Sequence, residues 1–501
     1  MKLGQLLNGI PAYHLSGDPE QEIQGLAYDS REVKPGYLFV ALKGHRQNGH
    51  DYLRNAVQNG AVALVMEDLQ EMKNDVAAVK VHNSREALSK MASQFYGHPF
   101  KGINMIGITG TNGKTTTSYL LESILSSAGA RPGVIGTINY RFMGKTHPAP
   151  VTTPESLDLM RLLREMADGS ATDVILEVSS HALHQKRTGD CQFRVAIFTN
   201  FSRDHLDYHK TLEEYFQAKS LLFRGLKKSE SAGGTSAIIN TDDPKGEELI
   251  RFTEADVITY GFGKKSQVRA DSFSADKTGT RAKLITPIGE KEIQSTLIGK
   301  INIYNILAAS AAAISLDVDL NTVAEGIERL GAVPGRLELV PNGRGLMIVV
   351  DYAHTPDALL KALATLSPLA KGRLITVFGC GGDRDKGKRY EMGLIAGENS
   401  DVVFATSDNP RSEDPDSIIE QIEEGIQKSG LKKELWSSGP QSMGKGYFIE
   451  VDRQKAISNA ISMANEKDLV LIAGKGHEDY QIVGGEIRYF DDRKEAASAA
   501  S

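Results

Sequence analysis

The sequence is short of cysteine and has no surplus of basic residues, and each shortage excludes a class of function. The two cysteines among its 501 residues, Cys191 and Cys380, are too few and too far apart for a disulfide framework or a zinc site. Lys and Arg number 58 against 64 Asp and Glu, which gives a formal charge of −6. Because no basic field is available to attract phosphate backbones, we expect no nucleic-acid partner.

Long apolar runs are missing as well. No apolar stretch approaches the length that spans a membrane, and residues 1–17 (MKLGQLLNGIPAYHLSG) lack the charged-then-apolar layout of a secretory signal. We therefore expect a protein of the reducing cytoplasm without membrane insertion. We also expect a monomer that acts on small molecules.

What the chain does have is length, glycine and an alternation of strand-like and helix-like patterns. With 501 residues, 40% of them hydrophobic, and 49 glycines, it is long enough for about three domains with many strand-to-loop turns. Short apolar runs alternate with amphipathic stretches, which is typical of α/β folds. We predict a small α/β domain over 1–100, a nucleotide-binding domain with a parallel sheet over 101–335, and a Rossmann-like doubly wound domain over 336–501. Residues 332–340 (AVPGRLELV) are the predicted linker into the third domain.

Residues 104–129 carry the strongest motif, NMIGITGTNGKTTTSYLLESILSSAG. A short apolar run leads into a glycine-rich turn and Lys-Thr, and leucine and isoleucine then recur at helical spacing. This layout binds nucleotide phosphates: Lys114 reaches the β and γ phosphates, and the Thr115 hydroxyl can bind Mg²⁺. Ile108 replaces the first glycine of the general pattern, and a plain glycine turn is the alternative interpretation. The predicted phosphate-binding residues are Gly110, Thr111, Asn112, Gly113, Lys114, Thr115 and Thr116.

A carboxylate follows a second apolar strand of the nucleotide-binding domain. Glu177 comes directly after residues 174–176 (VIL), at the sheet edge where ligands bind in open α/β folds. A carboxylate facing a phosphate loop suits Mg²⁺, so we predict that Glu177 and Thr115 share a metal ion; a solvated loop glutamate is the alternative. Upstream, Thr152 or Thr153 is the predicted cap of an amphipathic helix.

His205 and Lys219 carry little signal of their own. His205 follows the apolar run 195–198, but a lone histidine at a strand end is more often structural than functional. Lys219 lies in a predicted helix over 211–223, where its position indicates an ordinary amphipathic lysine that reaches solvent.

Three of the apolar strands predicted in the third domain end in chemically distinctive turns. Residues 379–389 (GCGGDRDKGKR) and 408–415 (DNPRSEDP) both carry arginine, which suits a dianionic or carboxylate-bearing ligand. A basic surface turn and a plain Asx-Pro turn are the alternatives. Residues 474–481 (GKGHEDYQ) resemble a phosphate loop, but Glu478 stands where Ser or Thr is expected, so we interpret them as a ligand loop. The first turn contains Arg384, Lys386, Lys388 and Arg389.

Two stretches of the third domain are predicted to lack regular structure. Residues 430–450 read as an irregular insertion, and the tail 496–501 (AASAAS) reads as a frayed end.

Taken together, the motifs resemble those of the Mur ligases, ATP-dependent enzymes that add amino acids to the peptidoglycan precursor. The resemblance spans the whole chain and rests on TGTNGKTTT, EVSSHAL, TNFSRDHLDYH, AKSLLF, GKINIYN, PGRLE and DYAHTP. Further stretches are similar to the members that extend UDP-MurNAc-L-Ala-D-Glu by a third residue: DSREVKPGYLFVALKG, GCGGDRDKGKR, DNPR and GKGHEDYQ. DNPR resembles the members that add meso-diaminopimelate. Lysine- or ornithine-adding members, and a non-catalytic nucleotide-dependent binding protein, are the alternatives.

The resemblance implies roles that the pattern of residues does not. It implies that Lys219 is carbamylated and that the new carboxylate holds a second Mg²⁺ with His205. The catalytic set is then Lys114, Glu177, His205 and Lys219, and the metal ligands are Thr115, Glu177, His205 and the Lys219 carbamate. The implied contacts are Ser30, His45, Arg46 and Gln47 for the UDP-sugar; Thr152, Thr153, Ser179, Gln185 and Arg187 for the peptide; Asn302, Arg336, Asp351 and His354 for adenosine; and Arg384, Asp408, Asn409, Pro410, Arg411, Gly474 and Glu478 for diaminopimelate. Tyr28 departs from the family, whose members often carry Leu there.

Overall fold

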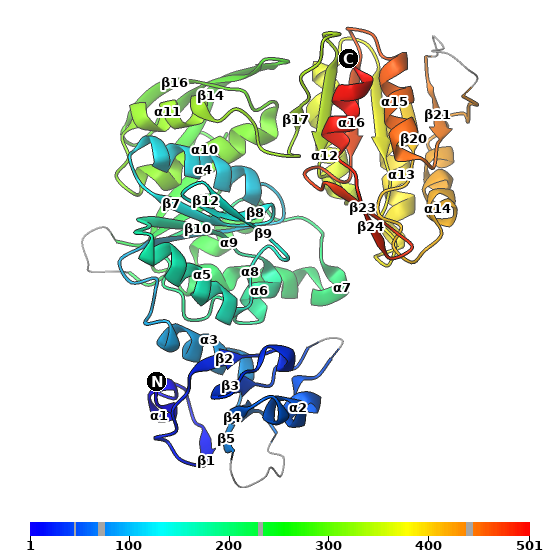
Figure 1. The fold of residues 1–501 in the computed structure, drawn as a ribbon. Helices are drawn as coiled ribbons and strands as arrows, with labels where there is room; N and C mark the ends of the chain where they lie inside the picture. The colour runs from blue at the N-terminus through cyan, green and yellow to red at the C-terminus, as the bar shows by residue number, and fades with distance from the viewer. Residues whose placement is uncertain (45–46, 69–75, 229–233, 437–443) are drawn as a thin grey trace.

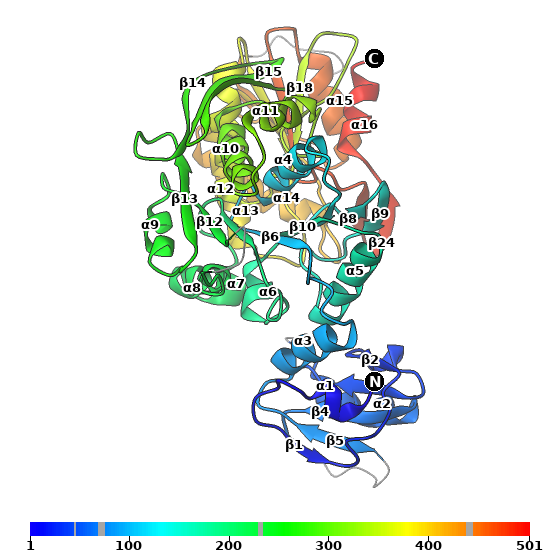
Figure 2. The same ribbon diagram turned by 90° about the vertical axis from the view of Figure 1, so that its left-hand side faces the viewer.

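The computed structural model describes residues 1–44, 47–68, 76–228, 234–436 and 444–501. Three α/β domains follow one another along the chain (Figure 1). In both views the N-terminal domain lies at one end of the central domain, and β14 and β15 lie at the opposite end (Figure 2). Among the described residues, no helix combines the length and the apolar character that crossing a membrane requires.

The N-terminal domain is built on a small sheet whose strands pair in the order β1-β5-β4-β3-β2. Neighbours are parallel except for β1, which pairs antiparallel with β5. The elements are α1 (Leu3–Leu6), β1 (His14–Ser16), β2 (Gly25–Ala27), η1 (Ser30–Glu32), β3 (Tyr37–Val40), η2 (Gly49–Tyr52), α2 (Leu53–Gln58), β4 (Ala61–Met66), β5 (Ala77–Lys80) and α3 (Ser84–Phe95).

The central domain holds a large sheet with the order β16-β15-β14-β13-β12-β11-β6-β10-β7-β8-β9. Neighbours from β14 through β7 run parallel, as predicted, whereas β15, β16, β8 and β9 join antiparallel. The elements are β6 (Asn104–Thr109), α4 (Lys114–Ser127), β7 (Pro132–Ile135), β8 (Asn139–Phe142), β9 (Lys145–Pro148), α5 (Ser156–Asp168), β10 (Asp173–Glu177), α6 (Ser180–His184), β11 (Val195–Phe198), α7 (Leu206–His209), α8 (Leu212–Arg224), β12 (Ser236–Asn240), α9 (Pro244–Ile250), β13 (Asp256–Gly261), β14 (Val268–Asp276), β15 (Gly279–Thr286), β16 (Gly289–Ser295), α10 (Lys300–Ile314) and α11 (Leu320–Arg329).

The order of the central strands decides where ligands can bind. Strands β10, β6 and β11 are neighbours, and their residues are buried because helices cover both faces of the sheet. Their carboxyl ends therefore bring the phosphate loop, Glu177 and the segment after Phe198 to one edge.

The C-terminal domain is a second α/β unit with the strand order β17-β18-β22-β19-β20-β21, and β23 and β24 form a separate hairpin. Strands β18 to β21 are parallel. The elements are β17 (Glu338–Leu339), β18 (Met347–Asp351), α12 (Pro356–Leu366), η3 (Ser367–Leu369), β19 (Leu374–Phe378), α13 (Gly387–Asn399), β20 (Val402–Ala405), α14 (Pro415–Lys428), β21 (Gly446–Ile449), α15 (Arg453–Met463), β22 (Leu469–Ala473), β23 (Tyr480–Val483), β24 (Glu486–Tyr489) and α16 (Asp492–Ala499).

Three local predictions are wrong. Residues 430–450 are not wholly irregular, because β21 within them adds a parallel strand beside β20. The tail is not frayed, because α16 packs into the core with Ala496 and Ala500 buried. Neither Thr152 nor Thr153 caps α5; Glu155 does, and its side chain accepts a hydrogen bond from the backbone N of Ser156 at 3.0 Å.

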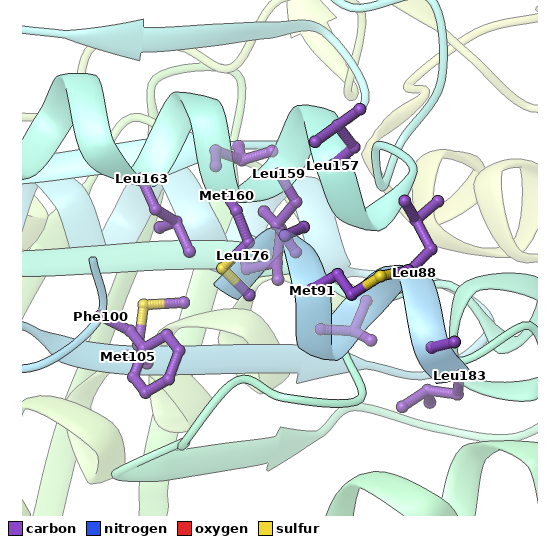
Figure 3. Close-up of a cluster of buried hydrophobic side chains, with 14 of the residues drawn as sticks. Leu88, Met91, Phe100, Met105, Leu157, Leu159, Met160, Leu163, Leu176 and Leu183 are labelled. Carbon is purple, nitrogen blue, oxygen red and sulfur yellow. The ribbon is translucent and has the colours of Figure 1, made fainter. Parts of the chain in front are cut away.

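The N-terminal and central domains share a continuous apolar core. Leu88 and Met91 of α3 pack with Leu157, Met160 and Leu163 of α5 in one buried cluster (Figure 3). A contiguous buried contact of this kind is strengthened by the hydrophobic effect and by close packing. The two domains are therefore joined firmly.

Candidate active site

The phosphate loop closes around its own lysine. Lys114 Nζ donates hydrogen bonds to the backbone oxygens of Gly110 and Thr111, both at 2.9 Å. Gly113 precedes α4 with φ of 87°, and a Cβ there would overlap the side-chain oxygen of Asn305, so glycine is required. The N-terminus of α4 and this lysine together form a site for anionic phosphate groups.

Glu177 is buried and bound by hydroxyl groups. Its Oε2 accepts hydrogen bonds from the hydroxyls of Thr115 and Thr137, each at 2.9 Å, and its Oε1 accepts one from the backbone N of Thr137 at 3.1 Å. The sequence predicts that Thr115 and Glu177 share a metal ion, and the structure places their side chains in direct contact. Thr137 was not foreseen, because a threonine after a short strand has no distinguishing pattern.

Lys219 is not the solvent-reaching lysine that its position indicated. Its side chain is 1% exposed, and its Nζ donates to the backbone O of Gly110 at 2.9 Å and lies 4.4 Å from the centroid of the Tyr215 ring. Burial and the nearby Lys114 cation hold the pKa of Lys219 well below its usual range. The structure thus places a buried amine, whose charged form is disfavoured, beside the phosphate loop.

His205 lies at the entrance of the same region. Its backbone adopts the left-handed conformation at φ of 53°, and its ring lies 4.8 Å from that of His181. Among the described residues, no group of three or more His, Cys, Asp or Glu side chains is arranged to hold a metal ion. The Thr115 hydroxyl and the Glu177 carboxylate are in contact and suit a hard cation such as Mg²⁺. His205 and the Lys219 amine are not part of this pair; the amine donates to the backbone O of Gly110.

The side chains predicted to bind the peptide substrate gather beyond Glu177. The Thr153 hydroxyl donates to the backbone O of Glu177 at 2.8 Å and accepts from the backbone N of Ser179 at 3.0 Å. Arg187 donates to the backbone O of Thr153 and to the side-chain oxygen of Gln185, both at 2.8 Å. Thr152 lies against Thr137, with the two hydroxyl oxygens 3.2 Å apart.

The residues predicted to bind the UDP-sugar are only partly described. Ser30 begins the short helix η1, and the backbone O of Gln47 accepts from Gly44 at 3.0 Å; His45 and Arg46 lie outside the described residues. The Tyr28 hydroxyl donates to Asp158 of α5 at 2.6 Å, so this unusual residue joins the N-terminal domain to the central one. A cavity of about 760 Å³ is lined by residues that include Tyr28, Glu155 and Arg187.

Of the residues predicted to bind adenosine, Arg336 comes closest to the phosphate loop. Its guanidinium donates to the Thr115 hydroxyl at 3.3 Å and lies 4.7 Å from the centroid of the Tyr352 ring. Asn302 is buried in α10, donates to the backbone O of Ile298 and accepts from Asn305. Asp351 is the last residue of β18 and accepts a hydrogen bond from the backbone N of Leu337 at 2.7 Å, and His354 follows the strand.

The turn at 408–411 and the loop at 474–478, which carry residues predicted to bind diaminopimelate, lie against each other. Asn409 Nδ2 donates to Glu478 Oε2 at 2.9 Å, and Arg411 donates to the backbone O of Gly382 at 2.7 Å. Pro410 is buried against Gly382, and a Cβ on Gly474 would meet the Asp408 carboxylate. Arg384 is exposed, and its one hydrogen bond among the described residues, to the backbone O of Asp383, is long at 3.5 Å.

Arg389 is a structural residue rather than part of a ligand pocket. It is fully buried and pairs with Glu413, its NH2 lying 2.9 Å from Oε1. The same guanidinium group donates to Gln421 of α14 at 3.1 Å. This pair ties the glycine turn at 379–389 to the turn at 408–415.

The fold and the site define a three-domain nucleotide-binding enzyme in which a phosphate loop on the central domain faces polar turns of a Rossmann-like domain. Family models match all three regions: "Mur ligase family, catalytic domain" at residues 22–96, "Mur ligase middle domain" at 108–313 and "Mur ligase, glutamate ligase domain" at 335–476. The chain belongs to the Mur ligase family, whose members are ATP-dependent ligases.

Similar proteins cover its full length. A UDP-N-acetylmuramoyl-L-alanyl-D-glutamate--2,6-diaminopimelate ligase from Geobacter sulfurreducens is 47% identical over 503 residues, covering 100% of this chain and 98% of the relative. One of the same name from Bacillus licheniformis is 43% identical, with coverage of 100% and 99%. A solved structure of a ligase of this name is 32% identical with a TM-score of 0.69, covering 100% of this chain and 98% of that one. A Thermotoga maritima MurF ligase in complex with ADP shares the fold, at 20% identity, a TM-score of 0.60 and coverage of 91% and 94%.

Proposed function

We propose that this protein is the ATP-dependent ligase that adds meso-diaminopimelate to UDP-MurNAc-L-Ala-D-Glu in peptidoglycan precursor synthesis, releasing ADP and phosphate. The observation that carries the proposal is the pairing of two sites: a phosphate loop with Glu177 and Lys219 on the central domain, and Arg411 with Glu478 on the C-terminal domain. The names of relatives 40–47% identical over the full chain support the same substrates.

The chemistry follows from the substrates. A carboxylate is a poor acyl donor, so ATP phosphorylates the γ-carboxylate of D-glutamate to an acyl phosphate. The amine of the third amino acid then attacks the acyl carbon, and phosphate leaves through a tetrahedral intermediate. Lys114 stabilises the charge that develops on the transferring phosphoryl group, because phosphoryl transfer between two anions needs positive charge more than covalent chemistry.

The donor set at the phosphate loop supports Mg²⁺ in two places. Thr115 and Glu177 would hold one ion, and His205 with a carbamate on Lys219 would hold a second; the cations offset the repulsion between the anionic reactants. Burial and the nearby Lys114 cation lower the pKa of Lys219, which favours the neutral amine that reacts with carbon dioxide and supports the proposed carbamylation.

The third substrate is inferred from complementary charge. Among the described residues, Arg411 forms no ion pair, so its guanidinium group is available to bind the distal carboxylate of diaminopimelate bidentately. Glu478 lies behind the same turn and receives the distal ammonium. Lysine and ornithine lack that carboxylate and would leave Arg411 unpaired.

The remaining assignments follow the family pattern. Ser30, His45, Arg46 and Gln47 bind the UDP-sugar, Thr152, Thr153, Ser179, Gln185 and Arg187 bind the dipeptide, and Asn302, Arg336, Asp351 and His354 bind adenosine. We further propose domain boundaries after residues 100 and 335, a cytoplasmic location and a monomeric enzyme. Two polar clusters support the second and third sets: the hydrogen bonds of Thr153 support the dipeptide set, and those of Arg336 support the adenosine set.

A phosphate-release assay tests the proposal. The purified protein is given ATP, Mg²⁺ and UDP-MurNAc-L-Ala-D-Glu, with meso-diaminopimelate, L-lysine or L-ornithine added in turn. We expect sustained release only with diaminopimelate, and a product whose mass increases by one diaminopimelyl residue. Tight nucleotide binding without any amino-acid-dependent turnover would favour the non-catalytic alternative.

A further inference from the structure

Lys475 is a buried cation in the 474–478 loop that the proposed function leaves without a task. Its side chain is fully buried, and its Nζ lies 3.2 Å from Glu478 Oε2, 3.3 Å from Asn409 Oδ1 and 3.9 Å from Asp408 Oδ1. Burying an ammonium group is costly unless opposite charge and hydrogen bonds surround it. Because Lys475 is buried, solubility does not explain a lysine at this position of the loop.

Glu478 is bound on one oxygen and free on the other. Oε2 accepts hydrogen bonds from both Lys475 and Asn409. Among the described residues, no hydrogen bond reaches Oε1, and the side chain keeps 17% of its exposure. One half of the carboxylate is therefore fixed in place, while the other half can accept a hydrogen bond from a ligand.

Hydrogen bonds also fix the neighbouring turn at 408–411, which carries Asn409 and Arg411. The backbone N of Ile482 donates to Asn409 Oδ1 at 2.9 Å, and the side chain of Gln481 donates to the backbone O of Asp408 at 2.7 Å. The backbone of Arg411 pairs with the hairpin, donating to Ile482 O at 3.0 Å and accepting from Gly484 N at 2.8 Å. Strand β23 thus fixes Asn409 and Arg411 together, and Lys475 and Asn409 fix Glu478.

We propose that Lys475 is a positioning residue for the third substrate, which pairs with Glu478 so that this carboxylate is oriented and charged to receive an ammonium group. This inference rests on the proposed function. Lys475 touches no substrate itself. It acts through Glu478, and it makes the site complementary to an amino-acid centre that carries both an ammonium group and a carboxylate.

Of the charged groups around Glu478, Lys475 is the one that most favours the ionised carboxylate. The charged or titratable groups that face Glu478 are Lys475, Asp408, Tyr352, Tyr480 and Arg453. Arg453 is committed to Asp492, its NH2 lying 2.7 Å from Oδ2. Burial already raises the pKa of Glu478, and Lys475 opposes that rise. Removing the Lys475 charge should therefore raise the pKa of Glu478 further and leave a larger fraction protonated at neutral pH.

The test compares Michaelis constants of the full-length enzyme and its Lys475→Met variant between pH 7 and pH 9. At pH 7 the KM for meso-diaminopimelate should rise about tenfold or more, while the KM for ATP stays within about twofold. The ratio of variant to unmodified KM should fall as pH rises, because Glu478 regains its charge when it loses the proton. The substrate amines also titrate in this pH range, but their effect on KM is the same for both enzymes and cancels in the ratio.

Glu478→Gln provides the matched control. In a Glu478→Gln background, Lys475→Met should cause little further loss and no pH-dependent ratio. A ratio that does not change with pH, or equal KM losses for ATP and the amino acid, would show a merely structural role and overturn the inference. Lys475→Gln, which keeps a donor but removes the charge, repeats the test if the methionine variant does not fold.

The unmodified enzyme separates this inference from the proposed function. If it fails to use diaminopimelate but uses lysine or ornithine, the proposed substrate is wrong. The same comparison of Lys475→Met is then made with that amino acid, whose distal ammonium would still meet Glu478. Loss of the pH-dependent ratio there would overturn the inference as well.

Discussion

At the scale of single residues, two lysines converge on one carbonyl group. Lys114 and Lys219 both donate to the backbone O of Gly110 at 2.9 Å. Burial lowers the pKa of both lysines, and the Lys114 charge lowers the pKa of Lys219 further, to well below its usual range. Conversion of its amine to a carbamate would replace a potential repulsion of Lys114 with an attraction, which is the physical rationale for the modification.

Lys219→Ala should therefore remove most activity, because the site loses an anion that holds a metal ion. Short-chain carboxylic acids added to the variant should restore part of the rate by occupying the vacated space. Phosphate release measured with and without acetate or propionate checks this expectation. Full activity of the alanine variant without any additive would contradict it.

Lys114→Ala should abolish turnover by a different route. The loss of charge at the transferring phosphoryl group should cost about 2.7–4 kcal/mol in the transition state, or roughly 10²–10³-fold in kcat. Binding of UDP-MurNAc-L-Ala-D-Glu should survive, because its predicted contacts lie on the N-terminal domain and around Thr153. Calorimetry in which dipeptide affinity collapses together with activity would argue against this separation.

The site residues that could be predicted from the sequence differ in one respect from those that could not. Thr115 and Glu177 belong to local patterns, a phosphate loop and an apolar strand end, so both could be singled out from the sequence as candidate site residues. Three residues that sequence reasoning missed make contacts far away in the sequence, and such contacts leave no local pattern: Thr137 with Glu177, Glu155 with Arg85, and Lys475 with Asn409.

At the scale of elements, buried central strands were predicted best. The apolar run 195–198 is β11 with the same bounds, since a strand covered on both faces reads as an unbroken apolar run. β21 and α16 were missed, because a short edge strand and an alanine-rich terminal helix gain their stability from packing rather than from their own sequence.

The turn at 408–411 has a fixed backbone conformation because it is hydrogen-bonded to β23 and the residue that follows this strand. Arg411 adopts the left-handed conformation at φ of 55°, fixed by its backbone hydrogen bonds to Ile482 and Gly484. Arg411→Ala should raise the KM for diaminopimelate about 100-fold while ATP and UDP-dipeptide binding change little. Arg411→Lys, which keeps the charge without the planar fork, should recover only part of the loss. Steady-state kinetics with each substrate varied in turn decides this, and an unchanged KM for diaminopimelate would remove Arg411 from the site.

At the scale of the whole molecule, the two domain junctions differ in kind. The N-terminal and central domains share a buried apolar cluster through α3 and α5 (Figure 3). At the junction of the central and C-terminal domains, Ile298 and Ile301 of the central domain pack with the apolar core of the C-terminal domain. Polar contacts there lie around Asp357, which accepts hydrogen bonds from Asn112 at 3.0 Å and Ser202 at 2.7 Å. Polar contacts can be exchanged for ligand or water at small cost, so motion belongs to the second junction.

Binding of a non-hydrolysable ATP analogue with the UDP-dipeptide should therefore change the distance between the central and C-terminal domains. This distance is measured by double electron–electron resonance between spin labels at exposed positions of the two domains. The distance between the N-terminal and central domains serves as the internal control and should stay constant. A larger change across the α3–α5 junction would show that the assignment of rigid and mobile junctions is reversed.

The most direct test of the account is the specificity for the third amino acid. The values of kcat/KM for meso-diaminopimelate and L-lysine are measured on the unmodified enzyme under the same conditions. Because lysine lacks the distal carboxylate and would leave the Arg411 guanidinium without its partner, we expect diaminopimelate to be preferred by a factor on the order of 10² or more. Equal or better use of L-lysine would contradict the account of Arg411 and Glu478 as the site that selects the substrate.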